Sequence, residues 1–168
     1  MKNLLLICGY SFSGKSTLAN KIAKELSETE IISLDKINQE RGFDISKDIS
    51  IENWEQTHQI AIERIKSSID KNLLIDDTNM FKKHRVRFAE AGISVGYVPI
   101  TIFIDTPKEV VLKRYMDYKE TDRHVPPKEA FEFVLENFEA PVPEENVINF
   151  QYNSKFNKFI SELRSRLN

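Results

Sequence analysis

A glycine-rich segment, Gly9 to Thr17, is the feature that most constrains how this chain can fold. It separates a short apolar run from an amphipathic stretch and matches the pattern G-x-x-x-x-G-K-S/T, which is typical of a phosphate-binding loop. Glycines let the backbone of such a loop wrap closely around an anion, and the N–H groups at the start of the next helix supply donors. Because the loop joins a strand to a helix, the segment predicts an α/β fold. The alternative, a turn that binds no ligand, is disfavoured by these flanking elements.

The rest of the chain alternates short apolar runs with longer amphipathic stretches, which predicts a parallel sheet covered by helices. Strands are expected at Asn3–Cys8, Glu30–Leu34, Asn72–Asp76, Tyr97–Asp105 and Val147–Phe150. Helices are expected at Lys15–Ser27, Ile51–Asp70, Phe81–Ala91, Pro107–Tyr115 and Lys155–Leu167. Pro99 predicts an irregular start or an edge position for the fourth strand. Two polar segments, Asn38–Ser50 and Asp117–Pro127, have the length of mobile loops over a site.

Composition predicts a single soluble domain over residues 1–168, with a lid at about residues 117–127. The 168 residues are 40 % apolar and 30 % charged, as in ordinary globular proteins. The net charge of −2 offers no global positive field, so a nucleic acid would need a local basic patch. The single Cys8 cannot form an internal disulfide, and the apolar run Leu4–Cys8 is too short to span a membrane. A cytoplasmic protein is therefore expected.

The glycine-rich segment predicts ATP and Mg²⁺ as cofactors. Lys15 can reach the terminal phosphates, and the Ser16 hydroxyl can ligate Mg²⁺. Thr17 is counted with the binding residues, although a residue at this place more often serves helix packing or capping. No Asn/Thr-Lys-x-Asp signature for guanine is evident. The residues of the segment predicted to contact the nucleotide are Gly9, Ser11, Phe12, Ser13, Gly14, Lys15, Ser16 and Thr17.

Carboxylates stand where the predicted strands end, and ligands bind at this edge of an open α/β sheet. Asp35 follows the second strand and is the candidate general base for an acceptor hydroxyl, unless it is a helix N-cap or a surface ion pair. Asp76 ends the third strand and could hold Mg²⁺. Asp77 could share that role or contact the acceptor, and either residue could instead cap the next helix. Asp105, after the fourth strand, is interpreted as a plain N-cap.

Several of these features occur in an order that resembles a known family. The loop Gly9–Thr17, Asp35, the run Asp77-Thr78-Asn79, the basic helix Lys82-Lys83-His84-Arg85 and an arginine-bearing lid look like the 5′-hydroxyl polynucleotide kinase and zeta-toxin-like branch of small P-loop kinases. Chloramphenicol phosphotransferases are a more distant comparison. The resemblance runs from residue 1 to about residue 150. It implies a three-layer P-loop NTPase fold, with a five-stranded parallel sheet of order 2-3-1-4-5, helices on both faces and ATP–Mg²⁺ chemistry.

The resemblance also implies roles for single residues. Lys15 and Ser16 correspond to phosphate and metal residues, Asp35 to the base and Asp77 to an acceptor-site residue. Arg114 and Arg123 correspond to lid arginines that neutralise charge on the transferring phosphoryl group, and Arg114 also counts as a nucleotide contact.

The lid and the acceptor side hold two ambiguities. Lys119 competes with Arg123 for the place of the second lid cation. Polynucleotide kinases carry an arginine three residues after the base, where this chain has Asn38, although Arg41 could substitute for it. Together with the pI of about 6.0, Asn38 disfavours a nucleic-acid acceptor.

Further residues are candidates for the acceptor site. Trp54 and His58 lie four apart on the long helix and so share a face, where they could contact the acceptor or serve core packing. The basic stretch from Lys82 to Arg87 could be a solvated helix face or a phosphate-binding patch. His84 and His124 are interpreted as surface residues. The residues predicted to contact the acceptor are Asp35, Arg41, His58, Asp77, Asn79 and Arg85.

These features predict a kinase that moves the γ-phosphate of ATP to a hydroxyl group of a small molecule or nucleotide. A 5′-hydroxyl polynucleotide kinase is one alternative, and a non-kinase ATPase or nucleotide-binding regulator is another. The sequence leaves the acceptor and the oligomeric state open.

Overall fold

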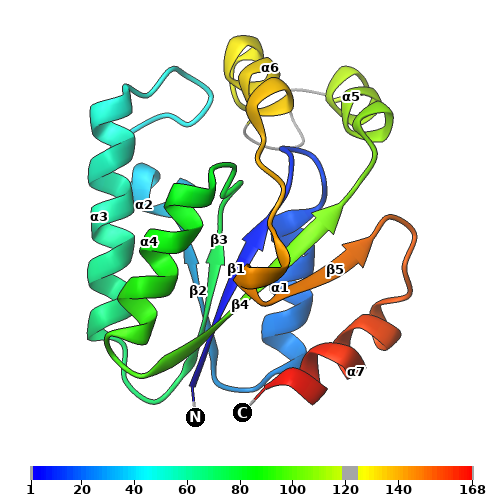
Figure 1. Cartoon of the computed structure of the whole chain (residues 1–168). Helices are drawn as coiled ribbons and strands as arrows, with labels where there is room; N and C mark the ends of the chain where they lie inside the picture. Colours follow the sequence, from blue (N-terminus) through cyan, green and yellow to red (C-terminus); the bar gives the residue numbers. More distant parts are fainter. Residues whose placement is uncertain (1, 119–124, 168) are drawn as a thin grey trace.

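A computed structural model describes residues 2–118 and 125–167. Within them, five parallel strands form one sheet of order β2-β3-β1-β4-β5 (Figure 1), which confirms the predicted fold. Because all strands are parallel, their carboxyl ends meet at one edge, the upper edge of the sheet in Figure 1. The strands are β1 (Lys2–Cys8), β2 (Thr29–Ser33), β3 (Asn72–Asp76), β4 (Tyr97–Asp105) and β5 (Val147–Gln151).

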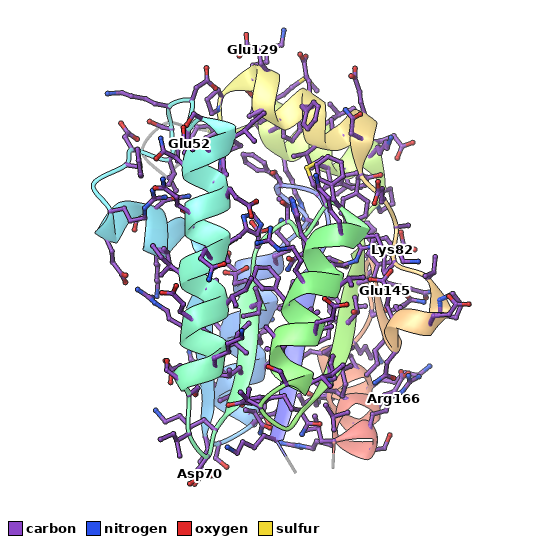
Figure 2. The ribbon with its side chains drawn as sticks, turned by 60° about the vertical axis from the view of Figure 1, so that its left-hand side comes forward. Glu52, Asp70, Lys82, Glu129, Glu145 and Arg166 are labelled. Carbon is purple, nitrogen blue, oxygen red and sulfur yellow. The ribbon has the colours of Figure 1, made fainter. Side chains whose placement is uncertain are left out.

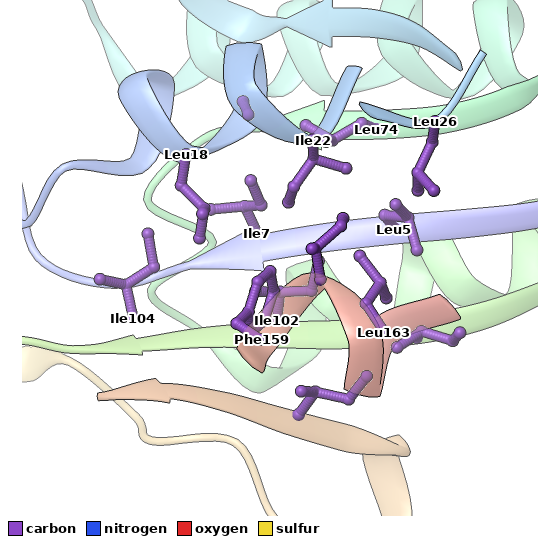
Figure 3. Packing of buried hydrophobic residues seen from close by; sticks show 14 residues of the cluster. Leu5, Ile7, Leu18, Ile22, Leu26, Leu74, Ile102, Ile104, Phe159 and Leu163 are labelled. Carbon is purple, nitrogen blue, oxygen red and sulfur yellow. The ribbon is translucent and has the colours of Figure 1, made fainter. Parts of the chain in front are cut away.

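Helices cover both faces of the sheet and make the three layers. The central strand β1 alternates between two hydrophobic clusters, as expected of a strand that is buried on both faces. Leu5 and Ile7 pack against α1 and α7 (Figure 3), whereas Leu4 and Leu6 pack against α2, α3 and α4. The helices of these two layers are α1 (Lys15–Glu25), α2 (Leu34–Glu40), α3 (Ile51–Ser67), α4 (Lys82–Ile93) and α7 (Phe156–Arg166).

Two helices lie above the carboxyl edge of the sheet, apart from these layers (Figure 1). They are α5 (Lys108–Met116) and α6 (Lys128–Asn137), and a short 3-10 turn, η1 (Pro143–Glu145), follows α6. Phe131 and Leu135 of α6 are buried in a third cluster with Val111 of α5 and Phe12 of the glycine-rich segment. These two helices therefore pack on that segment rather than on the sheet.

The structure corrects some of the predicted boundaries. The second strand was expected to continue to Leu34 and to be followed by a loop. Instead, helix α2 begins at Leu34, and Ser33 caps it because the Ser33 hydroxyl accepts from the Lys36 backbone N–H at 3.4 Å. Helix α6 was not predicted, and α3 ends at Ser67 rather than at Asp70.

Pro99 occupies a local edge, as predicted. Strand β4 pairs with β1 from Tyr97 onward, but β5 joins it only at Thr101. The Pro99 carbonyl accepts from the Asn146 side chain at 2.9 Å, on the side where β5 has not yet begun. The missing N–H of proline therefore costs no ladder hydrogen bond. None of the helices in residues 2–118 and 125–167 has both the length and the apolar character that a membrane span requires.

Candidate functional site

The glycine-rich segment forms the loop between β1 and α1 and leaves the start of α1 open. Gly14 is the N-cap residue of α1, has φ +103° and provides no side-chain cap, and the first turn of α1 carries no acidic residue. The positive end of the helix is thus available to an anion. A Cβ atom on Gly9 would meet the Ile104 carbonyl oxygen and the Ser13 hydroxyl at 3.0 Å each, so this position requires glycine.

Phe12 connects the loop to α5 and α6. Its backbone has φ +65°, which is unusual for a bulky residue. Its ring makes edge contacts with Tyr115 and Phe131, at centroid distances of 5.5 and 5.8 Å. The Arg114 guanidinium of α5 donates to the Phe12 carbonyl at 2.9 Å. This places Arg114 beside the loop, where it was predicted to act.

Asp76 meets Ser16 at the centre of the carboxyl edge. Asp76 is the last residue of β3, where its register partners are Ile7 of β1 and Ser33 of β2. Burial raises the pKa of its carboxyl, while a hydrogen bond from the Ser16 side chain and the charge of Lys15 act in the opposite direction. The Lys15 ammonium group donates to the Tyr10 carbonyl at 2.7 Å. A hydroxyl and a carboxylate held together in this way are the oxygen ligands that Mg²⁺ prefers.

Asp77 takes a different part, in the turn that follows β3. Its carboxylate accepts from the Asn79 backbone N–H at 2.9 Å, which is the Asx turn considered as an alternative. The Gly9 N–H donates to the Thr78 carbonyl at 3.1 Å, and the Asn79 side chain donates to the Ile7 carbonyl at 2.7 Å. Asn79 is fully buried, so its position suits the support of the loop rather than contact with an acceptor.

Arg85, expected at the acceptor site or in a basic surface patch, is instead buried. Its guanidinium forms a bidentate ion pair with Glu145 (2.6 and 3.1 Å) and donates to the carbonyls of Asn79 and Glu139 at 2.8 and 2.9 Å. With no exposed side-chain surface, Arg85 joins α4 to the chain before β5 and has no surface to offer an acceptor.

Arg41 is engaged as well. Its guanidinium donates to the Asn53 carbonyl and the Thr57 hydroxyl of α3, both at 2.6 Å. Thr57 in turn donates to the buried side chain of Asn38. Arg41 therefore ties the end of α2 to α3. Asp35 is exposed in the first turn of α2, and because Ser33 is the cap, the interpretation of Asp35 as an N-cap is wrong.

The two histidines on this side form a pair. His58 is buried, its Nδ1 lies 2.8 Å from the Trp54 carbonyl, and its ring lies 4.5 Å from that of His84. His84 is half-buried, which corrects its interpretation as a surface residue. Burial, followed by the neighbouring His58, lowers the pKa of His84 to about 4, although the charge of Asp77 opposes this shift. His84 is therefore neutral at pH 7. The helical spacing of Trp54 and His58 made His58 a candidate for the acceptor site, but nothing in the sequence indicated that His84 lies beside it.

A cavity of about 560 Å³ lies beside the loop, and this volume is typical of small-molecule sites. Phe150 and Phe156 line the cavity, and the Arg114 guanidinium lies 5.8 Å from the ring centre of Tyr152. Its lining also includes Phe12, Gly14, Thr17, Lys21 and Arg114.

The remaining predicted residues are placed as follows. Asp105 is exposed, and because Pro107 is the N-cap of α5, its interpretation as a cap is wrong. Arg123 and Lys119, the competing lid cations, lie outside the described residues, as does His124. In residues 2–118 and 125–167, no group of three or more His, Cys, Asp or Glu side chains could hold a metal ion.

With this geometry established, comparisons place the chain among known proteins. Residues 4–141 match the model of the AAA_33 family, an AAA domain, and the chain belongs to this family. No curated protein matches the sequence significantly.

Solved structures share the fold. A sugar kinase from Janibacter sp. HTCC2649 is 18 % identical, with a TM-score of 0.76 over 98 % of this chain and 94 % of that chain. Kti12 from Chaetomium thermophilum, in complex with ADP-AlF3, is 15 % identical, with a TM-score of 0.76 over 98 % and 99 %. The APS kinase of Mycobacterium tuberculosis, in complex with AMPPNP and APS, is 14 % identical, with a TM-score of 0.69 over 98 % and 96 %. The chain thus has the fold of small P-loop kinases.

The burial of Arg85 predicts a large loss of stability on its removal. Arg85→Ala leaves Glu145 as an uncompensated, nearly buried charge, so the free energy of unfolding should fall by about 3 kcal/mol or more in urea titrations. Arg87→Ala is the matched control: Arg87 lies on the same helix as Arg85, but its ion pair with Glu55 of α3 is largely exposed and should contribute under about 1 kcal/mol. Equal losses in the two variants would contradict a structural role for Arg85.

The lowered pKa of His84 predicts a pH dependence. The unfolded chain takes up a proton at this residue near pH 6.5, whereas the folded chain does so only near pH 4. Since the unfolded state binds more protons between these values, stability should decrease as the pH falls from about 6.5 to 4. His84→Gln should flatten this part of the profile, measured as the urea midpoint against pH. An unchanged slope would show that His84 does not carry it.

Proposed function

We propose that this protein transfers the γ-phosphate of ATP to a hydroxyl group of a small molecule or nucleotide. The observation that carries the proposal is the hydrogen bond between Ser16 and Asp76, next to Lys15 and the open start of α1. A loop that only bound an anion would have no need of a partly buried carboxylate beside it. The family, and the sugar kinase and APS kinase among the structures with this fold, support the same conclusion.

Ser16 and Asp76 are the residues that would hold Mg²⁺. Their hydroxyl and carboxyl groups are hard oxygen ligands, and few protein ligands suffice when substrate phosphates supply the others. The bound ion would neutralise charge on the phosphates. Asp77 is less suited to this role, because its carboxylate accepts from the Asn79 N–H in the turn.

Phosphate binding is assigned to the loop, to Lys15 and to Arg114. The Lys15 amine would leave the Tyr10 carbonyl and donate to the terminal phosphates of ATP. Arg114, held beside the loop through the Phe12 carbonyl, would stabilise charge on the transferring group, with Arg123 as the second lid cation and Lys119 as the alternative. The cavity lined by Phe150 and Phe156 would receive the base.

Asp35 is assigned as the general base. The register places Ser33 beside Asp76, and Asp35 follows two residues later at the exposed start of α2. The carboxylate would orient the acceptor hydroxyl and take its proton as the hydroxyl oxygen attacks the γ-phosphorus. Transfer rather than hydrolysis requires such a residue near the phosphates.

We expect Asp35→Asn to lower the rate of transfer from radiolabelled ATP by at least about 100-fold, while ATP binding measured by calorimetry stays the same. Asp105→Asn, which changes an exposed carboxylate at the end of β4, is the control and should keep the rate. Normal transfer by Asp35→Asn would remove Asp35 from the mechanism. Steady ATP hydrolysis that no sugar or nucleoside acceptor diverts would instead indicate a non-kinase ATPase.

Adjacent carboxylates give a matched pair for the metal. Asp76→Asn should raise the Mg²⁺ concentration needed for half-maximal turnover by at least about tenfold, because a charged ligand is lost. Asp77→Asn should leave this concentration nearly unchanged, since Asp77 is bonded in the turn. The reverse pattern in a Mg²⁺ titration would assign the metal to Asp77.

A further inference from the structure

A continuous row of rings borders the acceptor side of the site. It starts on α3 with Trp54 and His58, passes through His84 and Phe81 at the start of α4, and ends at Phe133 of α6. Successive ring centres lie 6.4, 4.5, 5.4 and 6.3 Å apart. These are distances at which aromatic rings interact favourably. We call these five residues the aromatic row.

The outer part of the aromatic row is not hydrophobic core. Phe81 and His84 are half-buried and Phe133 is 50 % exposed, and none of the three belongs to a hydrophobic cluster of the described residues. The chain after α6 is nevertheless anchored here, because the Glu139 N–H donates to the Met80 carbonyl and the Lys82 N–H to the Glu139 carboxylate. Large rings that are held in place but left exposed are typical of ligand-binding surfaces.

A second observation comes from His58. Its Nδ1 lies 2.8 Å from the Trp54 carbonyl, which can only accept, so Nδ1 carries a proton, and in the tautomer with hydrogen on Nδ1 the other nitrogen, Nε2, is an acceptor. Nε2 is buried and has no hydrogen-bond partner in the described residues. Buried polar atoms are rarely left unsatisfied, and an orphaned acceptor within the aromatic row matches a ligand that carries a hydroxyl group.

Most cationic groups near the aromatic row already have partners. Arg41, Arg85 and Arg87 are each engaged by other groups, Arg87 through its ion pair with Glu55. The amine of Lys83 lies 5.3 Å from the ring centre of Phe81 and so already contacts the aromatic row. Asp77 acts on His84 electrostatically, which places a carboxylate close to the row.

We infer, building on the phosphotransfer proposed above, that the acceptor is an uncharged compound whose flat ring stacks on the aromatic row while its hydroxyl group faces Asp35. A nucleoside and an aryl glycoside both have this chemistry. Phosphorylated acceptors are disfavoured, because the nearby guanidinium groups are already engaged and the carboxylates repel an anion.

Trp54, the single tryptophan of the chain, reports binding without any transfer. The protein is first saturated with Mg²⁺ and AMPPNP, which fills the nucleotide site, and is then titrated with four probes. Phenyl β-glucoside is compared with methyl β-glucoside, which lacks the aromatic ring, and uridine with uridine 5′-monophosphate, which adds charge. Phenyl β-glucoside and uridine should each change the Trp54 emission saturably and bind at least about fivefold tighter than their counterparts. Comparing these two probes distinguishes an aryl from a nucleobase ring.

Variants locate the binding surface. Phe133→Ala and His84→Ala should each weaken binding of the preferred probe by about fivefold or more, with AMPPNP affinity unchanged. Ile69→Ala, which removes an exposed apolar side chain outside the aromatic row, should have no effect. Equal affinity for the phenyl and methyl glucosides, equal affinity for uridine and its monophosphate, or unchanged binding by both row variants would each overturn the inference.

Failure of the inference and failure of the proposed function give different results. If ring-dependent binding occurs but no bound probe is ever phosphorylated, the aromatic row stands as a binding site and the kinase function fails. If an acceptor is phosphorylated while no probe shows ring-dependent binding, the kinase function stands and the aromatic row is only packing.

Discussion

The hydrogen bond from the buried Asn79 side chain to the Ile7 carbonyl holds the carboxyl edge of the sheet together. It joins the end of β1, where the phosphate loop begins, to the turn after β3, which carries Asp77. The Gly9 N–H donates to the Thr78 carbonyl of the same turn, and the Arg85 guanidinium donates to the Asn79 carbonyl. Asn79 holds a left-handed conformation with φ +46° to make these contacts. Because buried hydrogen bonds are costly to leave unmade, the relative position of the loop and the carboxylates depends on this one side chain.

Arg85 extends this constraint to distant parts of the chain. Its pair with Glu145 spans 60 residues and brings the segment before β5 against α4. Figure 2 shows Lys82 and Glu145 near each other, on the side of α4 that faces away from α3. A buried ion pair adds little net stability compared with apolar packing, but it is intolerant of a missing partner. It therefore specifies the path of the chain that leads from α6 back to the sheet.

Local patterns predicted the sheet and the loop well, because apolar periodicity and the glycine spacing act over a few residues. They predicted Asp76 as a metal-type carboxylate but could not separate it from Asp77, since only the register with Ile7 and Ser33 shows which one meets Ser16. The basic stretch from Lys82 to Arg87 gave no sign that Arg85 is buried, because its partner Glu145 lies far along the sequence. Helix α6 did carry a signal, in the i,i+4 pair Phe131 and Leu135 after a double proline, and this pair could have predicted it.

The arrangement also divides the site electrostatically across the end of β3. On one side lie Lys15, Arg114 and the positive end of α1, all beside the cavity that Phe12 helps to line. On the other side lie Asp35, Asp77 and two histidines, of which His84 is neutral at pH 7. In the proposed reaction, the first side would stabilise the negative charge that develops on the phosphoryl group, and the second side would stabilise a hydroxyl group that must lose a proton. Because the fold places these charges on opposite sides of Asp76, residues of the described part of the chain would by themselves orient a donor nucleotide and an acceptor toward each other.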